Sequence, residues 1–557
     1  MASHNNPLKI LETCRVAPFP NSSHSATELS LPLTFFDTFW LKFPPVERLF
    51  FYQLSHSTLQ HFNSTILPKL KHSLSLALLH YLPLAGKLTW PPNVPKPIIS
   101  YIPDDAVSLL VAESTADFNR LSGDDIRESP ELRHLTPELL TSDERASSMA
   151  LQITLFSNQG FSIGITTHHA VIDGNAATKF MKSWAYLCTK QDTQDPSLLP
   201  ELTPFFDRTV IKDPTGLYMV FLKNYSGSLG SDISEVNQLS LKVIEDLGVN
   251  RNSLRATFKL TREDIKKLRE KILSKAEEVK PTKELHLSTF VVTYVYLLIC
   301  LVKTRGEEGD RKVNFLFPVD YRNRMDPRLP ANYFGNCVFP GQAIIKASDF
   351  MEENGVVIIT EKISNMIRDI EEKGVYEGAE KNLENLMTVE AGAQTLSIAG
   401  SIRFNVYGVD FGWGRPKKVE IVSVDRTGAI ALAESGDGNG IEIGVVLNEN
   451  EMETFKSLFV SAKGKEGNRK GILGFRADYR TRLDPPLPLN YFGNCVRGHR
   501  VVAEARDFTE KNEVGFVAEK LSDKIKGLER GLEENDAKLT TMRGGGNSVW
   551  RCWVNPV

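Results

Sequence analysis

The sequence predicts a globular protein of two or more domains that contain both strands and helices. The chain has 557 residues, more than one ordinary hydrophobic core holds. Hydrophobic residues make up 41% of it and charged residues 24%, which is typical of a globular protein, so extensive disorder is not expected. Patterns with the period of a strand and patterns with the period of a helix both occur along the chain, and this predicts a mixed core.

Charge and cysteine usage limit the possible partners and compartment. The net charge is -3, so nothing suggests a surface for nucleic acid or anionic membrane. The six cysteines form no CxxC pair, which argues against a disulfide framework or zinc ribbon and fits a reducing compartment. No signal pattern opens the chain. The longest apolar run, 289–302, is shorter than the roughly 20 residues of a membrane span, so we expect a cytosolic protein.

The first 190 residues predict a series of strands and helices. Residues 31–52 are aromatic and broken by two prolines, which predicts a strand, a turn and an anchoring segment. Leucines at helical spacing predict an amphipathic helix over 65–81. Residues 151–167 predict two strands joined by an Asn-Gln-Gly turn at 158–160, and a helix should follow over 176–187.

The pattern weakens between residues 191 and 255. This stretch is polar and contains several prolines and a Gly/Ser cluster, so it is the best candidate for an interdomain linker. A charged helix is expected over 261–277 and a buried segment from residue 288 onward. Short strands with turns should then continue to about residue 460.

An internal repeat follows. Residues 320–337 and 478–495 are identical at 14 of 18 positions, at an offset of 158. The offset keeps further identities, so residues 463–557 hold a partial copy of about 313–390. One extra copy does not make a stacked-repeat fold. We interpret it as a recent duplication or a misjoined gene rather than as an independent third domain.

His169 and Asp173 form an HxxxD pair where a buried strand gives way to a helix. Histidine can take a proton from a hydroxyl near neutral pH. The aspartate could orient the ring in a helix, but Gly174 favours a tight turn in which it points elsewhere. The alternative is a buried, hydrogen-bonded histidine beside a turn-forming aspartate. His168 should face the other side of the strand, so only one of the two histidines can face a substrate.

Other candidate sites are weaker. A metal site at the paired histidines and Asp173 is not expected, because the other nine histidines are scattered. Asp410-Phe411-Gly412 lacks the other kinase motifs and reads as a glycine turn pinned by Trp413. The glycine-rich stretch 436–440 lacks the remaining ligands of a calcium loop and reads as a hairpin turn.

Arg322 and Arg324 flank an extended segment. They are either solvated surface arginines or a partner for Asp173, since a buried acid needs a positive group to remain charged.

Five stretches together resemble the BAHD acyltransferase family of plants. They are LTFFDTFWL near the start, LPLAGKL, HHAVIDG, NYFGNC and DFGWG. The resemblance covers about residues 5–462 in family order. The resemblance is greatest to the branch that acylates sugars of anthocyanins and other phenolic glucosides, as judged from LTFFD, YFGNC and the run before DFGWG. Many members of that branch use malonyl-CoA.

The resemblance implies an α/β fold of two chloramphenicol acetyltransferase-like domains, each a mixed sheet flanked by helices. The domains would be 1–210, with HxxxD, and 211–462, with DFGWG, and the active-site channel would lie between them. Acyl-CoA would be a co-substrate and no cofactor would be bound. Family members are usually monomeric. The copy in 463–557 lacks HxxxD, so it cannot form a second active site.

The family's functional residues carry over as follows. His169 would act as general base on the acceptor hydroxyl, and no acyl-enzyme would form. Asp173 would be structural, turned away from the channel and paired with Arg322. The remaining expected residues are Asp410, Gly412, Trp413 and Gly414, which would hold the C-terminal domain in shape; Ser288 and Thr289, which match the CoA channel; and Ser401, near the place of an oxyanion donor.

The resemblance leaves the substrate open. Malonyl-CoA with a phenolic or flavonoid glucoside is the first choice, and a hydroxycinnamoyl-CoA donor is the alternative. A cation in the acyl pocket would favour malonyl, yet Asn175 after Asp173-Gly174 is neutral. A non-catalytic ligand-binding role is the alternative of another class, which the intact HxxxD pair argues against.

Overall fold

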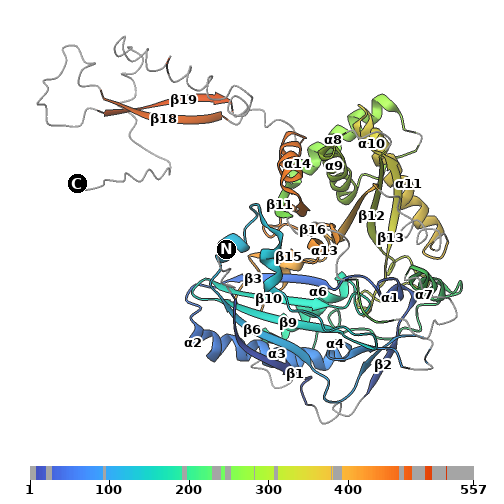
Figure 1. The fold of residues 1–557 in the computed structure, drawn as a ribbon. Helices are drawn as coiled ribbons and strands as arrows, with labels where there is room; N and C mark the ends of the chain where they lie inside the picture. The colour runs from blue at the N-terminus through green and yellow to red at the C-terminus, as the bar shows by residue number, and fades with distance from the viewer. Residues whose placement is uncertain are drawn as a thin grey trace, which may run out of the picture. The chain divides into compact units, whose positions relative to one another are not determined.

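The structure is a computed structural model, and the chain forms two compact units, Met1–Phe459 and Val460–Val557. The residues described are 8–20, 28–91, 94, 96–190, 197–228, 240–244, 253–281, 283–306, 311–377, 379, 392–462, 470–478, 496–504 and 522. The larger unit contains the two sheets that position the candidate site (Figure 1).

The first large sheet comes mainly from the N-terminal half. Its strand order is β1 (Leu8–Val16), β6 (Val107–Ser114), β9 (Met149–Phe156), β10 (Gly160–Thr167), β3 (Val46–Gln53) and β15 (Lys418–Ile421). Helices α3 (Leu67–His80) and α6 (Gly174–Thr189) pack against each other, and the Trp184 indole of α6 donates to the carbonyl of Leu70 in α3 at 3.1 Å. β9 and β10 are buried along their whole length, so the strand that leads to the HxxxD pair is anchored in the core.

The second large sheet comes mainly from the C-terminal half. Its order is β13 (Val338–Lys346), β12 (Lys312–Asp320), β14 (Gln394–Gly400), β16 (Ile430–Glu434), β17 (Gly440–Leu447), β11 (Leu254–Thr261) and β7 (Arg127–Glu128). Helices α8 (Arg262–Val279), α9 (Thr289–Thr304), α10 (Ala347–Met351) and α11 (Gly355–Lys373) gather on it, with α14 (Glu449–Ala462) nearby (Figure 1). α9 is the most apolar of these helices and is buried along most of its length.

Smaller elements complete the described part of the larger unit. A four-stranded sheet has the order β2 (Leu29–Pro32), β5 (Ile98–Tyr101), β4 (Lys87–Thr89) and β8 (Arg145–Ser147). The short helices are α1 (Phe35–Phe39), α2 (Leu59–His61), η1 (Phe62–Ile66), α4 (Leu82–Ala85), α5 (Phe118–Leu121), η2 (Ser129–Leu135), α7 (Leu217–Ser228), η4 (Val406–Gly408) and α13 (Val424–Thr427).

The two halves of the chain exchange strands. β15 follows the DFGWG turn but pairs with β3 of the first sheet, and β7 from the N-terminal half pairs with β11 of the second. Each sheet therefore ends in a strand supplied by the other half, and the expected boundary at residue 210 does not divide the strands cleanly between the sheets.

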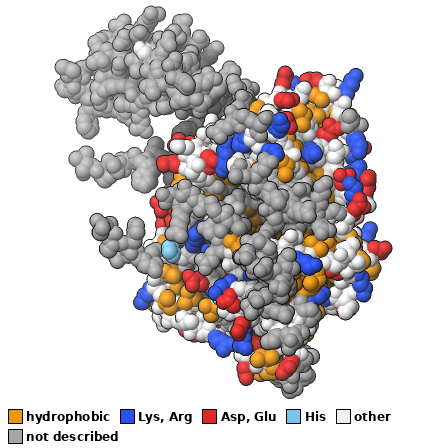
Figure 2. Space-filling view, turned by 45° about the vertical axis from the view of Figure 1, so that its right-hand side comes forward, with side chains coloured by type: hydrophobic (Ala, Val, Ile, Leu, Met, Phe, Trp, Pro, Cys, Tyr) orange, Lys and Arg blue, Asp and Glu red, His pale blue; other side chains and the backbone are white. Residues whose placement is uncertain are grey.

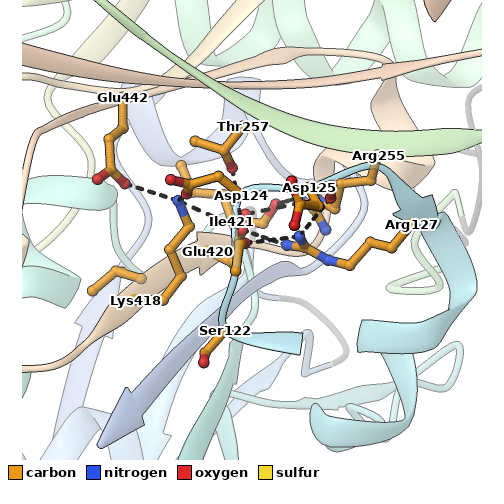
Figure 3. A network of polar contacts seen from close by, with 12 residues as sticks. Ser122, Asp124, Asp125, Arg127, Arg255, Thr257, Lys418, Glu420, Ile421 and Glu442 are labelled. Carbon is orange, nitrogen blue, oxygen red and sulfur yellow. Dashed lines mark hydrogen bonds and ion pairs between the residues drawn. The ribbon is translucent and has the colours of Figure 1, made fainter. Parts of the chain in front are cut away.

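Buried charges join the exchanged strands. Glu420 of β15 pairs with Arg127 of β7 at 2.6 Å and with Arg255 of β11 at 3.7 Å, while Lys418 pairs with Asp124 at 2.7 Å (Figure 3). Burial alone raises the pKa of Glu420, but the charges of Lys418, Arg255 and Arg127 outweigh burial and hold that pKa below its ordinary value. The exchange is therefore stabilised by the pairs of Glu420 with two arginines, which are buried on both sides and which solvent screens little.

The smaller unit repeats a hairpin of the larger one. β18 (Lys470–Asp478) pairs with β19 (Val496–Glu504), and the partners Lys470↔Glu504 reproduce Lys312↔Lys346 of β12 and β13 at the offset of 158 in both strands. The residue types do not repeat with the register. Phe339, 1% exposed and packed against Phe39 and Phe221, corresponds to Arg497 in the copy.

Most elements expected from hydrophobic periodicity are confirmed. The helix over 65–81 is α3, the paired strands in 151–167 are β9 and β10, and the helix over 176–187 is α6. The charged helix over 261–277 is α8, which begins at a capping box formed by Thr261 and Asp264. No helix in the described ranges has the length and apolarity to cross a membrane.

Two expectations about local structure are wrong. Within 31–52, Phe35–Phe39 form helix α1 rather than a strand, because Thr34 and Asp37 make a capping box at its start. The stretch 191–255 is more than a linker, because it contains α7, which packs against α1 and buries Phe221 and Leu222 completely.

Surface charge shows no single-sign field on the face in Figure 2. Acidic and basic side chains are interspersed there with apolar ones over the described surface. This agrees with the small net charge of -3.

Substitution of Glu420 by Gln should destabilise the larger unit by about 3–5 kcal/mol, because it leaves two buried arginines without their shared carboxylate. The matched control is Glu270→Gln, which removes an exposed pair with Lys266 at 4.0 Å and should cost less than about 0.5 kcal/mol. Urea unfolding of both variants provides the comparison. A loss of less than about 1 kcal/mol for Glu420→Gln would contradict the role given to the network.

Candidate active site

His169 lies in the turn between β10 and α6, and aromatic rings fix its imidazole. The ring stacks on the Trp40 indole, with a centroid distance of 4.1 Å and an interplanar angle of 6°. Phe43 meets it edge-on at 6.2 Å. Trp40 is itself held, because its indole nitrogen donates to the carbonyl of Val338 at 3.2 Å. The imidazole is half-buried and has a defined plane.

The environment keeps His169 neutral. Burial lowers its pKa to about 4 from an ordinary 6.5; its own carbonyl, Asp173 and Asn336 oppose this, while Arg48 adds to it. Nδ1 is buried and has no hydrogen-bond partner in the described residues, so the ring meets solvent through the edge that carries Nε2. A neutral imidazole with an accessible nitrogen can accept a proton at physiological pH.

His168 has no such access. It is fully buried, and its Nδ1 accepts the main-chain N–H of Ala170 at 3.2 Å. Burial lowers its pKa to about 3. Of the two histidines, only His169 is partly exposed, so His169 stays the predicted histidine of a substrate site.

Asp173 turns away from the imidazole, as the resemblance implied. Its Oδ1 accepts the main-chain N–H groups of Asn175 and Ala176 at 3.1 and 2.9 Å, which caps the N-terminus of α6. Its Oδ2 accepts from Arg322 at 2.8 Å and from the N–H of Cys337 at 3.1 Å. Both oxygens are engaged with the scaffold, so Asp173 shapes the turn that carries His169.

The ion pair with Arg322 is buried on both sides. The side chains are 3% and 1% exposed. Burial by itself lowers the pKa of Arg322, but Asp173 and Asp320 raise it above the ordinary value. Arg324 does not join this cluster; it lies 3.6 Å from Glu371 and is about one-third exposed.

A second buried carboxylate, Asp37, holds the neighbouring amide. Its Oδ1 accepts the main-chain N–H of Asn336 at 2.9 Å and the Asn336 side-chain amide at 3.1 Å. Its Oδ2 accepts from Thr34 and from Arg208. Asn336 also donates to the carbonyl of His169 at 2.9 Å. We call this arrangement the double latch: Asp37 and Asp173 accept hydrogen bonds from the successive main-chain amides of Asn336 and Cys337.

The double latch was not expected from the sequence, which indicated only the pairing of Asp173 with Arg322. The spacing Thr34-x-x-Asp37 is the sequence signature of a capping box. The internal repeat also marked Asn336 and Cys337, since both are kept at positions 494 and 495 while the flanking strands have diverged. Trp40 carried no signal of its own within its aromatic stretch.

Three further expected residues lie at the ends of elements in the C-terminal half of the chain. Ser401 follows β14 and is half-buried, with its hydroxyl accepting the N–H of Arg403 at 3.2 Å. Ser288 caps α9 through the N–H of Val291 at 3.3 Å, and Thr289 begins that helix. No hydrogen bond within the described ranges joins any of the three to His169, and their roles stay predictions.

The DFGWG turn is built as the sequence predicted. Asp410 Oδ1 accepts the N–H groups of Gly412 and Gly414 at 2.8 and 3.0 Å, and both glycines have φ near +97°, a region that favours glycine. Trp413 packs edge-on against Phe161 at 5.8 Å, and Phe411 packs on Tyr52 at 5.6 Å. These rings belong to the first sheet, so the turn docks the C-terminal half onto the N-terminal half.

Metal-binding groups do not gather in the described part of the chain. There, no three side chains of His, Cys, Asp or Glu are placed to hold one ion. The groups that surround His169 are aromatic rings, amides and a neutral carbonyl rather than a ligand set.

Comparisons with known proteins agree with the geometry. The model of the transferase family matches residues 8–462 and matches again over 457–542, the region of the repeat. Phenolic glucoside malonyltransferase 1 of Arabidopsis thaliana is 46% identical over 81% of this chain and 97% of its own length. The Arabidopsis malonyl-CoA:anthocyanidin 5-O-glucoside-6''-O-malonyltransferase is 43% identical over 82% and 99%.

A solved structure shows the same fold. Vinorine synthase aligns with a TM-score of 0.59 over 82% of this chain and 98% of its own, at 20% sequence identity. The expected arrangement of mixed sheets flanked by helices is confirmed by this likeness. From the family match and the relatives above, the chain belongs to the transferase family, among its BAHD acyltransferases.

Proposed function

We propose that the protein transfers a malonyl group from malonyl-CoA to a sugar hydroxyl of a phenolic or flavonoid glucoside, with His169 as general base. The observation that carries the proposal is a neutral imidazole, stacked on Trp40 and open on one edge, whose neighbouring acid is occupied by the scaffold. The names of the two Arabidopsis relatives, a phenolic glucoside and an anthocyanidin glucoside malonyltransferase, support the choice of donor and acceptor.

The reaction needs one group that accepts a proton and one group that donates a hydrogen bond to the oxyanion. Nε2 of His169 takes the proton of the acceptor hydroxyl as its oxygen bonds to the thioester carbon. The tetrahedral intermediate then collapses, the bond from carbon to sulfur breaks, and the CoA thiolate leaves with the proton from His169. The half-buried hydroxyl of Ser401 is our candidate for the donor to the oxyanion. Asp173 stays outside the proton transfer because Arg322 and three main-chain amides occupy its oxygens.

A hydroxycinnamoyl-CoA donor is the second candidate for the same site. The two relatives above favour malonyl, and a direct comparison of donors separates the two. Incubation with malonyl-CoA or coumaroyl-CoA and a mixture of flavonoid glucosides, read by mass spectrometry, identifies the transferred group by its mass.

Replacement of His169 by Ala should lower kcat by about 10²–10⁴-fold, the usual contribution of a general base. The Tm should change little, because the ring is only half-buried. His286→Ala is the matched control, since that side chain is exposed and should leave kcat as in the parent. Turnover by the His169 variant within a few-fold of the parent would remove His169 from the mechanism.

The pH dependence of kcat/KM should show an acid limb near pH 4 rather than near 6.5. The rate should fall only where the imidazole becomes protonated, and burial lowers its pKa to about 4. Lowered pKa values of His168 and His169 also mean that the folded state binds fewer protons than the unfolded chain. Stability from these groups is thus present above about pH 6.5 and lost as the pH falls toward 4, so circular dichroism must accompany each rate. A limb at 6.5 in folded protein would contradict a His169 imidazole that its surroundings keep neutral.

A further inference from the structure

Arg48 is a buried cation that has no carboxylate within ion-pair distance among the described residues. It lies on β3, is 4% exposed, and takes part in no ion pair among the described residues. Its Nη1 donates to the Thr178 hydroxyl at 2.7 Å and to the carbonyl of Gly174 at 3.4 Å, both in the first turns of α6. The Phe404 ring lies 5.5 Å from the guanidinium carbon. Burial lowers the pKa of Arg48 to about 10, although the charges of Asp173 and Glu434 oppose this. These acids therefore do not offset the cost of burying the cation, and its position favours a further anion.

The free edge of Arg48 has the shape that binds a carboxylate. Nε is buried with no hydrogen-bond partner, and no hydrogen bond of the described residues uses Nη2. Nε–H and Nη2–H point to the same side of the planar guanidinium, and two parallel donors of this kind bind one carboxylate through both oxygens. The one nitrogen that faces the other way, Nη1, is already engaged by α6.

This residue also lines a cavity. The cavity is small, about 30 Å³ in volume, and lies between β15 and the second sheet, with Arg48, Phe404, Gly400 and Leu432 among its lining residues. Two acids lie in its lining. Glu420 is paired with Arg127, and Glu442 is paired with Lys418 and Lys259. They are therefore not available to satisfy Arg48.

The arginine lies beside the reacting turn. Its Nη2 is 2.7 Å from where a Cβ on Gly174 would be, which places it against the residue next to Asp173. Its charge contributes to the lowered pKa of His169. Asn175, in the same first turn of α6, is neutral. Arg48 thus supplies a positive charge from β3, next to the first turn of α6, where the helix has the neutral Asn175.

We propose that the Nε–Nη2 edge of Arg48 binds the free carboxylate of a dicarboxylic acyl group on the acyl-CoA donor and so selects malonyl over acetyl. The inference rests on the proposed function and names the residue behind its donor specificity. Malonyl carries its carboxylate one methylene from the thioester carbon, so the anion and the reacting carbon reach neighbouring positions. A bound carboxylate also offsets the field of Arg48 at His169, which makes the imidazole a stronger base with this donor.

The test compares malonyl-CoA and acetyl-CoA with one glucoside acceptor, using the full-length chain. Arg48→Gln should lower the malonyl-to-acetyl ratio of kcat/KM by about 10- to 100-fold, as for the loss of a charged hydrogen bond, with most of the effect in KM for malonyl-CoA. Arg262→Gln, at an exposed arginine, should leave the ratio as in the parent. Equal losses with both donors would overturn the proposal and make Arg48 a support of α6.

Two further arms separate the possible failures. Adding Asn175→Lys to Arg48→Gln should restore part of the malonyl preference, because it returns a cation to the first turn of α6; no recovery counts against an electrostatic role. If the Arg48 variants do not fold, the parent enzyme still answers: the acid limb of kcat should lie at higher pH with malonyl-CoA than with acetyl-CoA, and coincident limbs would overturn the proposal. A parent enzyme that transfers acetyl but no malonyl would instead defeat the proposed function.

Discussion

The candidate active site depends on the hydrogen bonds that two buried carboxylates accept from the turn at Asn336 and Cys337. Asp37 and Asp173 come from the N-terminal half, and the amides that they hold, Asn336 and Cys337, come from the C-terminal half. The side chain of Asn336 continues the contact to the carbonyl of His169. The catalytic turn, the start of α6 and the entry to β13 therefore have one common support, and the position of the imidazole follows from it.

Burial strengthens the hydrogen bonds of the two carboxylates and also explains why each carboxylate is paired with an arginine. A carboxylate removed from water is costly unless each oxygen is paired. Arg208 forms an ion pair with Asp37, and Arg322 forms one with Asp173. Main-chain N–H groups donate hydrogen bonds to the rest of the carboxylate lone pairs. The ion pairs around Glu420 repeat the same solution where β7 and β15 exchange between sheets. Exposed pairs such as Lys266–Glu270 contribute little by comparison.

The sequence predicts local elements better than the contacts between halves. The leucines of α3 and the strands around the Asn-Gln-Gly turn follow their periods, because one face of each is buried locally. HxxxD and DFGWG, read with the family resemblance, located His169 and the turn at Asp410. Periodicity does not encode a partner 299 residues away, as for Asp37 and Asn336, nor the stacking of Trp40 on His169. Helix α1 was hidden because its aromatic residues resemble a strand, although its capping box was present in the sequence.

A double-mutant cycle on kcat/KM with Asp37→Asn and Asp173→Asn tests the double latch most directly. If both carboxylates act through the one turn at Asn336 and Cys337, the second substitution should cost less than it does alone, with an interaction energy of about 0.5–3 kcal/mol in folded protein. Losses that add within about 0.5 kcal/mol would show two independent contributions. That result would contradict a shared support for His169.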